Sequence, residues 1–338
     1  MSKPRLAFVP GDANGIGPEL TAKVLSSPPI DADIILIGDE KVIAHGEYVS
    51  GKNIPRQTTT LVDIKKPWPQ NTVAFLPHDH AAVSITPGQI SAACGKKSLA
   101  ELSTAVLLAQ QGIVDGVCFA PLNKEAMKAG GMEAADELHH LAALLDFDGA
   151  LSEINVMDFG VWTSRVTSHV ALRCVPALIT GDKIKDAAKL LVNTLKIAAV
   201  AAPKIAIAAL NPHGGDGGNF GREEIDIIAP AVQALCAEGY HVVGPYPADT
   251  LFRRTQKESI NGVVTMYHDQ GQIAMKLQGF ERGVSVLGGL PVAVTTPAHG
   301  TAFDIAGQNK TFIGAMEEAL QVLSQMMSPK KGKNHSED

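Results

Sequence analysis

The sequence predicts an α/β protein with a mostly parallel sheet and a second domain inserted into the first. Its 338 residues suggest about two domains, because a domain usually has roughly 100–200 residues. Apolar segments of strand length alternate with segments of helical period, which is typical of parallel sheets covered by helices on both faces. Residues 152–173 instead alternate like antiparallel strands, and this change of pattern indicates the insertion. We expect residues 1–130 and 300–330 to form the first domain and 131–299 the second, with 331–338 as a flexible tail.

The expected elements follow one another along the chain. Each strand is a short run of aliphatic residues, and each helix repeats apolar residues every three or four positions. Strands are expected at residues 6–10, 33–37, 72–76, 116–120, 205–210, 262–265 and 291–295. Helices are expected from near residue 16 and at 40–45, 98–111, 123–128, 187–201, 225–238, 271–277 and 314–327. Gly239 is expected to end the helix at 225–238, because glycine adopts the left-handed conformation that closes many helices.

The composition excludes several classes of protein. Hydrophobic residues make up 45% and charged residues 19% of the chain, which excludes a disordered protein. The net charge is −6 and the 29 Lys and Arg are dispersed, so no nucleic-acid partner is expected. No apolar run reaches the roughly 20 residues that span a bilayer, and none follows the N-terminus as in a signal peptide. We therefore expect a cytoplasmic protein without a membrane partner. The cysteines lack metal-site spacing and are expected to be small buried apolar residues: Cys94, Cys118, Cys174 and Cys236.

Three of the 11 histidines stand in contexts suited to metal binding. His213 follows the strand expected at 205–210, His268 follows the strand expected at 262–265, and His169 lies in the alternating segment. Ligands of parallel α/β sheets collect where strands end, and three imidazoles can hold a divalent cation with positions open for substrate. The alternative for each is an ordinary loop or core histidine, and for His169 alone the two interpretations have equal weight.

Four other histidines are weaker candidates. His78 and His80 have the spacing of a metal pair, but histidines two residues apart on a polar loop are often only exposed. His139 and His140 are adjacent, so on a helix they cannot share a face.

Two glycine-rich segments follow expected strands. Gly-Asp-Ala-Asn-Gly-Ile-Gly-Pro-Glu at 11–19 lacks the G-x-G-x-x-G spacing, so a tight turn into a helix explains it as well as a nucleotide site does. His-Gly-Thr-Ala-Phe-Asp-Ile-Ala-Gly at 299–307 follows the strand at 291–295. Its short side chains and backbone amides suit close approach by a ligand.

These two segments together resemble the isocitrate/isopropylmalate dehydrogenase superfamily. A fuller set of motifs resembles one branch of it, the 4-hydroxythreonine-4-phosphate dehydrogenase family of vitamin B6 synthesis. The additional motifs are Asn-Pro-His-x-Gly-x-Gly-Gly at 211–218, Gly-x-Glu-Glu at 221–224, Gly-Pro-x-Pro-Ala-Asp-Thr at 244–250 and Tyr-His-Asp-Gln-Gly at 267–271. The motifs run in the family order from residue 11 to 307 and are jointly specific.

The resemblance implies a homodimer of two-domain α/β/α subunits of the isocitrate/isopropylmalate dehydrogenase type, with an active site shared between subunits. It implies a divalent metal (Zn, Co, Ni, Mn or Mg) held by His169, His213 and His268, one of them from the neighbouring subunit. It also implies NAD, with NADP as the alternative, along the 299–307 segment. The cofactor contacts expected from it are Gly11, Asp12, His299, Gly300, Thr301 and Asp304.

The implied reaction is oxidation of a secondary alcohol of a hydroxy acid by hydride transfer to NAD, followed by decarboxylation. Three residues match family positions with catalytic or substrate-binding roles. Lys276 matches a substrate-binding lysine that can neutralise an anionic group, and Asp249 and Asp269 match positions near the substrate amine or hydroxyl. Which group accepts the proton is left open.

The chain departs from the family at its substrate-binding positions. Family members with phosphorylated substrates carry Gly-His-Thr-Glu where this chain has Asp-Glu-Leu-His, so Glu137 and Leu138 replace the His and Thr. Ser285 replaces an expected Asn, and Val294 replaces an expected Arg. A phosphate is normally met by Arg forks and by amide or hydroxyl donors, so these changes leave it poorly matched.

We therefore hypothesise a divergent member that acts on a different small anionic or polar substrate. Alternatives are 4-hydroxythreonine 4-phosphate itself, a four-carbon sugar-acid phosphate, or a cis-dihydrodiol carboxylate from aromatic-acid degradation. A catalytically silent protein that binds metal or nucleotide is the alternative from a different class.

Overall fold

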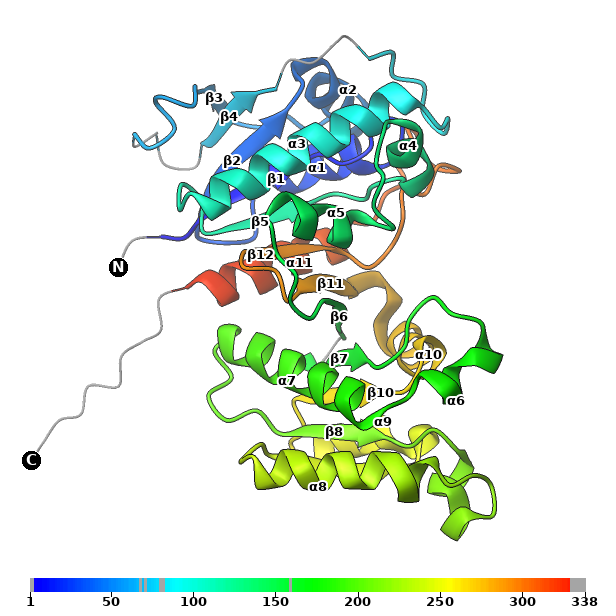
Figure 1. Cartoon of the computed structure of the whole chain (residues 1–338). Coiled ribbons are helices and arrows are strands. Elements are labelled where there is room, and N and C mark those ends of the chain that lie inside the picture. Colours follow the sequence, from blue (N-terminus) through cyan, green and yellow to red (C-terminus); the bar gives the residue numbers. More distant parts are fainter. Residues whose placement is uncertain (1–2, 67–68, 70–71, 79–82, 158–159, 329–338) are drawn as a thin grey trace, which may run out of the picture.

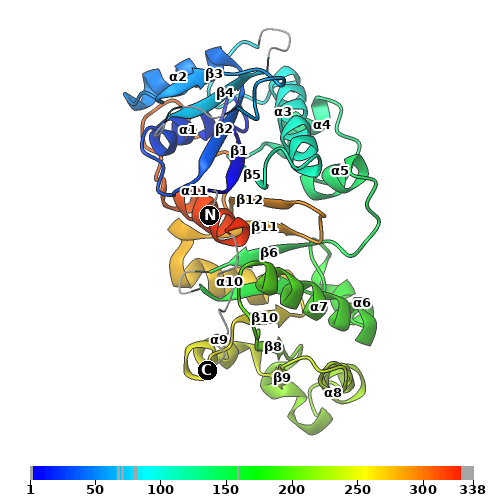
Figure 2. The same cartoon turned by 90° about the vertical axis from the view of Figure 1, so that its left-hand side faces the viewer.

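A twelve-stranded sheet runs through the whole described part of the chain, with helices on both of its faces (Figures 1 and 2). The computed structural model describes residues 3–66, 69, 72–78, 83–157 and 160–328. The strand order is β3-β4-β2-β1-β5-β12-β11-β6-β7-β10-β8-β9. The strands are β1 Arg5–Val9, β2 Asp33–Gly38, β3 Arg56–Thr58, β4 Val73–Pro77, β5 Gly116–Phe119, β6 Ser152–Val156, β7 Trp162–Arg165, β8 Ile205–Ala208, β9 Val242–Tyr246, β10 Gly262–Thr265, β11 Val284–Gly288 and β12 Ala293–Pro297.

The helices divide between the two faces of the sheet. In Figure 2, α1, α2, α9, α10 and α11 lie on one side of the strands, and α3 to α8 lie on the other. The α-helices are α1 Gly17–Leu25, α2 Glu40–Ser50, α3 Ala92–Gln110, α4 Lys124–Ala129, α5 Glu137–Leu144, α6 Val175–Leu178, α7 Gly181–Ile197, α8 Ala229–Ala237, α9 Ala248–Lys257, α10 His268–Gly279 and α11 Gly314–Met327. Short turns of other helix types span Leu172–Cys174, Pro212–Gly218, Glu224–Ile228 and Phe280–Arg282.

The sheet is parallel in its two outer parts and antiparallel between them. Strands β6 and β7 pair antiparallel, with Asn155 opposite Thr163, which confirms the pattern expected within 152–173. The chain then leaves the sheet after Arg165, so the alternation at 166–173 does not form a strand. Strand β11, which the sequence did not indicate, pairs antiparallel with both β12 and β6.

Strand β1 shows why the sheet is covered on both faces. Leu6 and Phe8 belong to one core cluster with residues of α1 and α11, whereas Ala7 and Val9 belong to a second with residues of α3. Successive side chains of a strand point to opposite faces, so a strand that is apolar throughout needs a helix layer on each side. The α/β fold class predicted from the sequence is thus confirmed.

Helix starts differ most from expectation, because capping side chains set them. Helix α3 begins at Ala92, where the Ser91 hydroxyl accepts a hydrogen bond from the backbone N–H of Cys94. Helix α7 begins at Gly181 after the Thr180 cap. Gly239 follows α8 with φ +88°, as expected for a residue that ends a helix.

The cysteine prediction is half right. Cys94 and Cys118 are buried, but Cys174 and Cys236 are exposed because both lie on the solvent side of short helical segments.

Among the described helices, none combines the length and apolar character that crossing a membrane requires. The domain limits stay a prediction, and the tail at 331–338 lies outside the described residues.

Candidate functional site

Two of the three candidate histidines lie side by side at the edge of the sheet. His169 follows β7 and His268 begins α10 directly after β10. These strands are parallel neighbours, with Arg165 opposite Thr265, so the chain leaves both at the same edge. The imidazole centroids of His169 and His268 are consequently 5.6 Å apart.

The surroundings of His169 favour a neutral imidazole, and a carboxylate contacts the ring of His268. Burial, together with the charges of Arg165, Lys124 and His268, lowers the pKa of His169. Nδ1 of His268 lies 2.8 Å from Oδ1 of Asp269, and this contact orients the ring. A neutral imidazole with one nitrogen held by a carboxylate is the arrangement in which histidine commonly binds a metal ion.

His213 lies on a segment with an unusual backbone. It follows β8, the parallel neighbour of β10, and five successive residues from His213 to Gly217 have positive φ. The buried carboxylate of Glu224 holds the start of this segment by accepting hydrogen bonds from the backbone N–H groups of Leu210 and Asn211, both at 2.8 Å. His213 is exposed, and its ring lies 6.4 Å from that of Phe220.

The described residues of one chain do not bring all three histidines together. No group of three or more His, Cys, Asp or Glu within the described ranges is placed to hold a metal ion. A single subunit therefore supplies the pair His169 and His268, and the metal triad that the resemblance implies stays a prediction.

A cavity of about 200 Å³ lies beside His169. Because β6 and β7 are antiparallel, the start of β6 lies next to the carboxyl end of β7, and residues of both strands and of α5 line the cavity. The cavity is lined by Lys124, Asp136, Glu137, Leu138, His139, Leu151, Ser152, Glu153, Arg165, Val166, Ser168, His169 and Leu287. Its wall thus mixes cations, carboxylates, hydroxyls and leucines, as small-molecule sites do.

Arg165 is the centre of a buried hydrogen-bond network on one wall of the cavity. Its guanidinium donates to Oε2 of Glu153 at 2.6 Å, Oδ1 of Asn155 at 3.1 Å and Oγ of Ser168 at 3.1 Å. Gln272 of α10 donates to the same Asn155 oxygen at 2.7 Å. Although burial raises it, the pKa of Glu153 is brought below its usual value by Arg165 and by its hydrogen bonds. The network therefore joins the wall of the cavity to the helix that carries His268.

Ser285 belongs to this network rather than to the cavity lining. Its hydroxyl donates to Oε1 of Glu153 at 2.5 Å and accepts from Nδ2 of Asn155 at 2.9 Å. Ser285 is only 2% exposed and does not line the cavity. Its link to the cavity is the hydrogen bond to Glu153, which does line it. A substrate-binding role for Ser285 stays a prediction.

Leu138 and Val294, at positions where the resemblance implies polar residues, are part of the hydrophobic core. Leu138 and Val294 belong to one core cluster together with Leu287. Leu138 and Leu287 also line the cavity, with Val294 fully buried behind them. Leu138 and Leu287 thus join the core to the cavity and give the cavity an apolar wall.

Glu137, the neighbour of Leu138, brings a carboxylate into the cavity. Its Oε2 is buried without a hydrogen-bond partner, and the ammonium group of Lys124 lies 3.7 Å away. Burial raises the pKa of Glu137, and the charge of Lys124 opposes this only in part.

The catalytic candidates that the resemblance supplied lie on the surface. Lys276 is exposed on α10, the helix that begins at His268. Asp249 is exposed near the start of α9. Asp269 is exposed and contacts His268. None of these three lines the described cavity, and their roles stay predictions.

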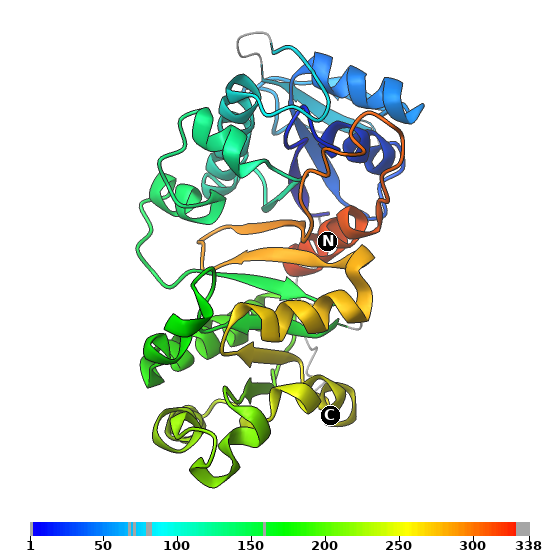
Figure 3. The ribbon, with the colours of Figure 1, turned by 90° about the vertical axis from the view of Figure 1, so that its right-hand side faces the viewer.

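The expected cofactor segment packs against the first glycine-rich loop (Figure 3, orange and blue). The backbone N–H of Ile16 donates to the carbonyl of Thr301 at 3.0 Å, and a Cβ on Gly15 would lie 2.9 Å from Cβ of Thr301. Gly300 and Asp304 are exposed, while His299 is half-buried, and burial lowers the pKa of its ring.

Gly11 and Asp12, the other cofactor candidates, serve the packing of the loop. A Cβ on Gly11 would lie 2.4 Å from the carbonyl oxygen of Ala120, so only glycine fits. Asp12 is 1% exposed and accepts a hydrogen bond from the backbone N–H of Asn14. Burial raises the pKa of Asp12 to about 6. These contacts explain both residues as part of a tight turn, the alternative that the sequence left open.

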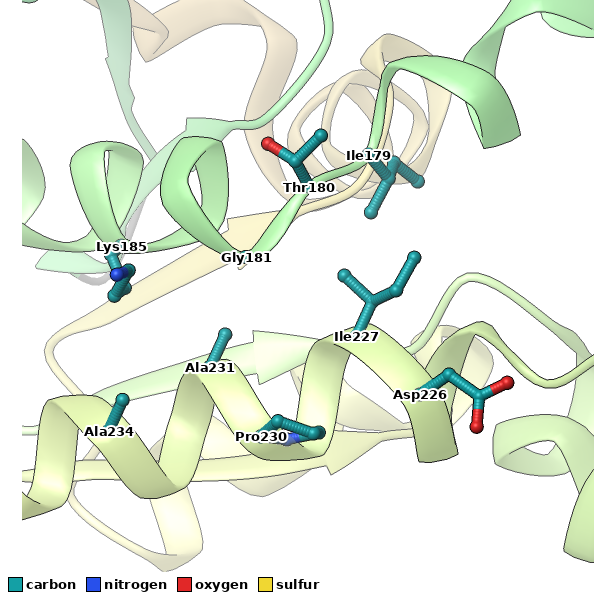
Figure 4. A pocket seen from close by; sticks show the side chains of 9 residues that line it. All are labelled: Ile179, Thr180, Gly181, Lys185, Asp226, Ile227, Pro230, Ala231 and Ala234. Atoms are coloured by element: carbon teal, nitrogen blue, oxygen red, sulfur yellow. The ribbon is translucent and has the colours of Figure 1, made fainter.

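A second cavity, of about 460 Å³, lies between the start of α7 and helix α8 (Figure 4). Its lining is mostly aliphatic, with Lys185 and Asp226 as its charged side chains. None of the candidate residues from the sequence is among the described residues that line it, so it has no part in the site.

Of the weaker histidine pair, His78 lies 2.9 Å from the hydroxyl of Thr104, and His80 lies outside the described residues.

Sequence reasoning missed Lys124, Glu153 and Arg165, which supply much of the charge of the cavity. A usable signal was present for two of them. Glu153 and Arg165 are single charges within two adjacent strand segments that are otherwise apolar or neutral, and such charges are seldom buried without a partner.

A mostly parallel α/β sheet with a polar cavity and paired imidazoles at its edge defines an α/β protein with a small-molecule site. The family described as "Pyridoxal phosphate biosynthetic protein PdxA" matches residues 31–323, and the chain belongs to this family. The resemblance drawn from the motifs is thereby confirmed.

Relatives of this chain carry the names of dehydrogenases. A Pseudomonas aeruginosa protein named "Putative 4-hydroxythreonine-4-phosphate dehydrogenase 2" is 45% identical over 96% of this chain and 97% of that protein. A Cutibacterium acnes protein named "Putative D-threonate 4-phosphate dehydrogenase" is 37% identical over 95% of this chain and 93% of that protein.

Solved structures of similar proteins share the fold. The 4-hydroxythreonine-4-phosphate dehydrogenase of Klebsiella pneumoniae has a TM-score of 0.85 and 30% identity, covering 97% of this chain and 98% of that one. A terephthalate 1,2-cis-dihydrodiol dehydrogenase of Burkholderia xenovorans LB400 has a TM-score of 0.67 and 28% identity, covering 96% of this chain and 98% of that one.

Proposed function

We propose that this protein is a metal- and NAD-dependent dehydrogenase that oxidises a secondary alcohol of a small hydroxy acid, with subsequent loss of carbon dioxide. The observation that carries the proposal is the pair His169 and His268, 5.6 Å apart beside a cavity lined by Lys124 and Arg165. At this cavity, imidazole nitrogens that can bind a metal ion lie close to cations that can bind the carboxylate of an acid substrate.

The donor set fits a divalent metal ion. His169 and His268 of one subunit would hold it, and His213 of a second subunit would complete the triad. Imidazole suits Zn, Co, Ni and Mn better than Mg. When bound, such an ion lowers the pKa of a coordinated hydroxyl and stabilises negative charge that develops on oxygen.

The chain's own residues bind and orient the acid. Lys124 and Arg165 supply positive charge on the cavity wall, and Lys276 is proposed to neutralise an anionic group of the substrate. Asp269 orients the ring of His268 through its 2.8 Å contact and, with Asp249, is a candidate to accept the hydroxyl proton.

The segment from His299 to Gly307 fits a nucleotide. Gly300 has no side chain to block a ligand, and a Cβ there would meet no atom within 4 Å. The exposed carboxylate of Asp304 can accept hydrogen bonds from ribose hydroxyls and would repel a 2′-phosphate, which favours NAD over NADP.

The names of the relatives favour a phosphorylated four-carbon hydroxy acid as the substrate, either 4-hydroxythreonine 4-phosphate or D-threonate 4-phosphate. They thus support the alternatives over our first hypothesis of a substrate outside this group. They also favour an enzyme over a catalytically silent binding protein.

The test is NADH formation by the purified protein with Co²⁺ or Mn²⁺ and a panel of hydroxy acids and their 4-phosphates. We expect turnover of at least one four-carbon acid. We expect His169→Ala and His268→Ala each to lower kcat/KM at least 100-fold, because each removes a proposed metal ligand. His241→Ala, at an exposed site before β9, is the matched control and should retain activity. Flat absorbance with every compound, despite measured NAD binding, would favour the silent binding protein.

A cis-dihydrodiol carboxylate is the second candidate substrate. The specific observation in its favour is the apolar wall formed by Leu138, Leu151 and Leu287, which suits a carbon ring better than a phosphate. Including one such diol in the panel separates the two candidates by their kcat/KM values.

A further inference from the structure

We propose that the first glycine-rich segment, 11–19, serves the cofactor by holding the second one, and that Glu19 is the positioning residue that sets the affinity for NAD. The inference rests on the proposed function, because residues 299–307 are the segment proposed to bind NAD. It deepens that function by giving the 11–19 segment a role in cofactor binding without a contact to the cofactor.

The proposed cofactor segment has no regular secondary structure of its own. Residues 298–313 connect β12 to α11 and form neither a helix nor a strand. Their backbone hydrogen bonds to one another are short turns, such as that from the N–H of Ile305 to the carbonyl of Ala302 at 3.1 Å. Long connections of this kind are usually functional, and holding one in its bound conformation lowers the cost of binding a ligand.

Glu19 attaches this segment to α1, over which it runs (Figure 3). Glu19 is the third residue of α1 and is 2% exposed. Its Oε1 accepts hydrogen bonds from the backbone N–H of Thr311 at 2.9 Å and from the hydroxyl of the same residue at 2.5 Å. Its Oε2 accepts one from the backbone N–H of Asn309 at 3.2 Å. Asn309 has a φ of 56°, which costs free energy for a residue with a Cβ, so the carboxylate holds a turn that the backbone alone does not favour.

Lys23 completes the attachment from the next turn of α1. Its ammonium group donates to Oε1 of Glu19 at 2.8 Å and to the carbonyl oxygen of Thr311 at 3.1 Å. Burial acts to raise the pKa of Glu19, but the hydrogen bonds from Lys23 and Thr311 bring it below its usual value. Glu19 is therefore a carboxylate at neutral pH, and a charged acceptor forms stronger hydrogen bonds than a neutral one.

Asn14 supports the cofactor segment at a second point. Its side chain is buried, accepts a hydrogen bond from the backbone N–H of Thr86 at 2.7 Å and donates one to the carbonyl of Gln89 at 2.8 Å. Gly88, between these two residues, packs so closely against Phe303 that a Cβ would lie 2.9 Å from the carbonyl oxygen of Phe303. The first glycine-rich segment therefore holds the second both directly and through residues 86–89.

The test compares NAD binding by wild type, Glu19→Ala, Glu19→Gln and Glu47→Ala. Glu47 is the matched control, because it is a half-buried carboxylate on α2 that also pairs with a cation, Arg56, and accepts from a backbone N–H, that of Ile54 at 2.8 Å. Calorimetry without metal or hydroxy acid gives the Kd for NAD, and steady-state kinetics give KM and kcat. Thermal unfolding reports whether each variant is folded. Thr311→Val, which removes one donor to Glu19, takes the place of Glu19→Ala if that variant does not fold.

We expect Glu19→Ala to raise the Kd for NAD about tenfold, because a loosened segment must be ordered when NAD binds. The KM for NAD should rise by the same factor, while kcat at saturating NAD and the KM for the hydroxy acid should change by less than about threefold. Glu19→Gln keeps an oxygen that accepts from Thr311 and should recover most of the affinity. Glu47→Ala should lower the Tm and leave the Kd and KM for NAD unchanged.

Amide hydrogen exchange of the NAD-free protein tests the attachment itself. In Glu19→Ala, the N–H groups of residues 299–311 should exchange about tenfold faster than in the wild type, because local opening of the segment costs less. In Glu47→Ala their exchange should match that of the wild type.

Three outcomes would overturn the inference: equal Kd values for NAD in Glu19→Ala and Glu47→Ala, unchanged exchange of residues 299–311 in Glu19→Ala, or a wild type that binds no NAD. A different result separates the inference from the proposed function. NAD binding that depends on Glu19, without NADH formation from any hydroxy acid, would reject the proposed dehydrogenase and retain the role of Glu19.

Discussion

Lys97 is a buried cation that the proposed chemistry does not use. Its side chain is 3% exposed, and its ammonium nitrogen lies 3.2 Å from Asp39 and 2.9 Å from Glu101. Glu101 is 2% exposed, so both partners of this ion pair are buried. Burial raises the pKa of Glu101 to about 7, with Lys97 opposing the shift. The three residues join the start of α2 to the middle of α3, so their role is to stabilise the fold.

Lys97→Met should lower the free energy of unfolding by about 3–5 kcal/mol, because it leaves two carboxylates buried without their cation. Urea unfolding at pH 8 measures the loss. Lys96→Met is the matched control: Lys96 is exposed on the same helix, and its loss should change stability by at most about 0.5 kcal/mol. Equal effects of the two substitutions would show that the buried cluster contributes nothing.

The loss in Lys97→Met should also depend on pH. Without the ammonium group, the folded-state pKa of Glu101 rises further above its unfolded value of 4.5. The folded variant then keeps a proton that the unfolded chain releases, so its stability falls as pH rises through this window. Unfolding at pH 5 should therefore show a smaller loss than unfolding at pH 8.

At the scale of elements, the segment from His213 to Gly217 is the most strained part of the site. His213 and Asp216 have φ values of 54° and 45°, which cost free energy for residues with a Cβ. Glu224 holds the segment, and a Cβ on Gly215 would lie 2.7 Å from its Oε2. That oxygen also accepts a hydrogen bond from the side chain of Asn211 at 2.9 Å, so it cannot move away freely.

Gly215→Ala should therefore destabilise the chain more than Gly214→Ala. Both glycines have positive φ, but a Cβ on Gly214 would meet no atom within 4 Å. We expect a loss of about 1–2 kcal/mol for Gly214→Ala from the backbone alone, and about 1–3 kcal/mol more for Gly215→Ala from the clash. Urea unfolding measures both, and a Co²⁺ titration should show weaker binding by Gly215→Ala. Identical unfolding curves would argue that Glu224 yields without cost.

Strands that are marked by a local run of apolar residues were predictable from the sequence. Strands that depend on pairing with distant strands were not. The strands around Phe8, Cys118 and Val264 are continuous apolar runs, and they form where expected. Strand β11 was missed because Val284–Gly288 is bounded by glycines and holds a serine, and its pairing with β6 and β12 stabilises it.

The candidate site divides in the same way. His268 was found because it follows an expected parallel strand and such strands end at one edge of the sheet. His169 lay in the alternating segment, and only the family resemblance favoured it as a ligand over an ordinary histidine. Arg165 and Glu153 were missed because their pairing depends on the register of β6 against β7, which no local pattern states. The position of His213 relative to this pair depends on a second subunit in our proposal, and a single sequence does not describe that arrangement.

At the scale of the whole molecule, the proposed shared site predicts complementation between inactive subunits. His213→Ala and His169→Ala should each be inactive alone. In a mixture that exchanges subunits, half of the dimers are mixed, and each mixed dimer has one intact site and one site that lacks both ligands. We therefore expect about a quarter of the wild-type activity. No recovery, with mixed dimers demonstrated by mass spectrometry, would place all ligands within one chain.

The antiparallel strands at the middle of the sheet also determine how the molecule can move. Strands β5, β12, β11, β6 and β7 are hydrogen-bonded neighbours, so the two outer parts of the sheet are joined by an unbroken ladder rather than by a linker. A hinge would have to break backbone hydrogen bonds inside this ladder. Any rocking of one half against the other must instead be spread as a change of twist over several strands, like the flexing of a plate. We therefore expect such motion to have small amplitude, and we expect the loops at the edges of the sheet to move more than its two outer parts do.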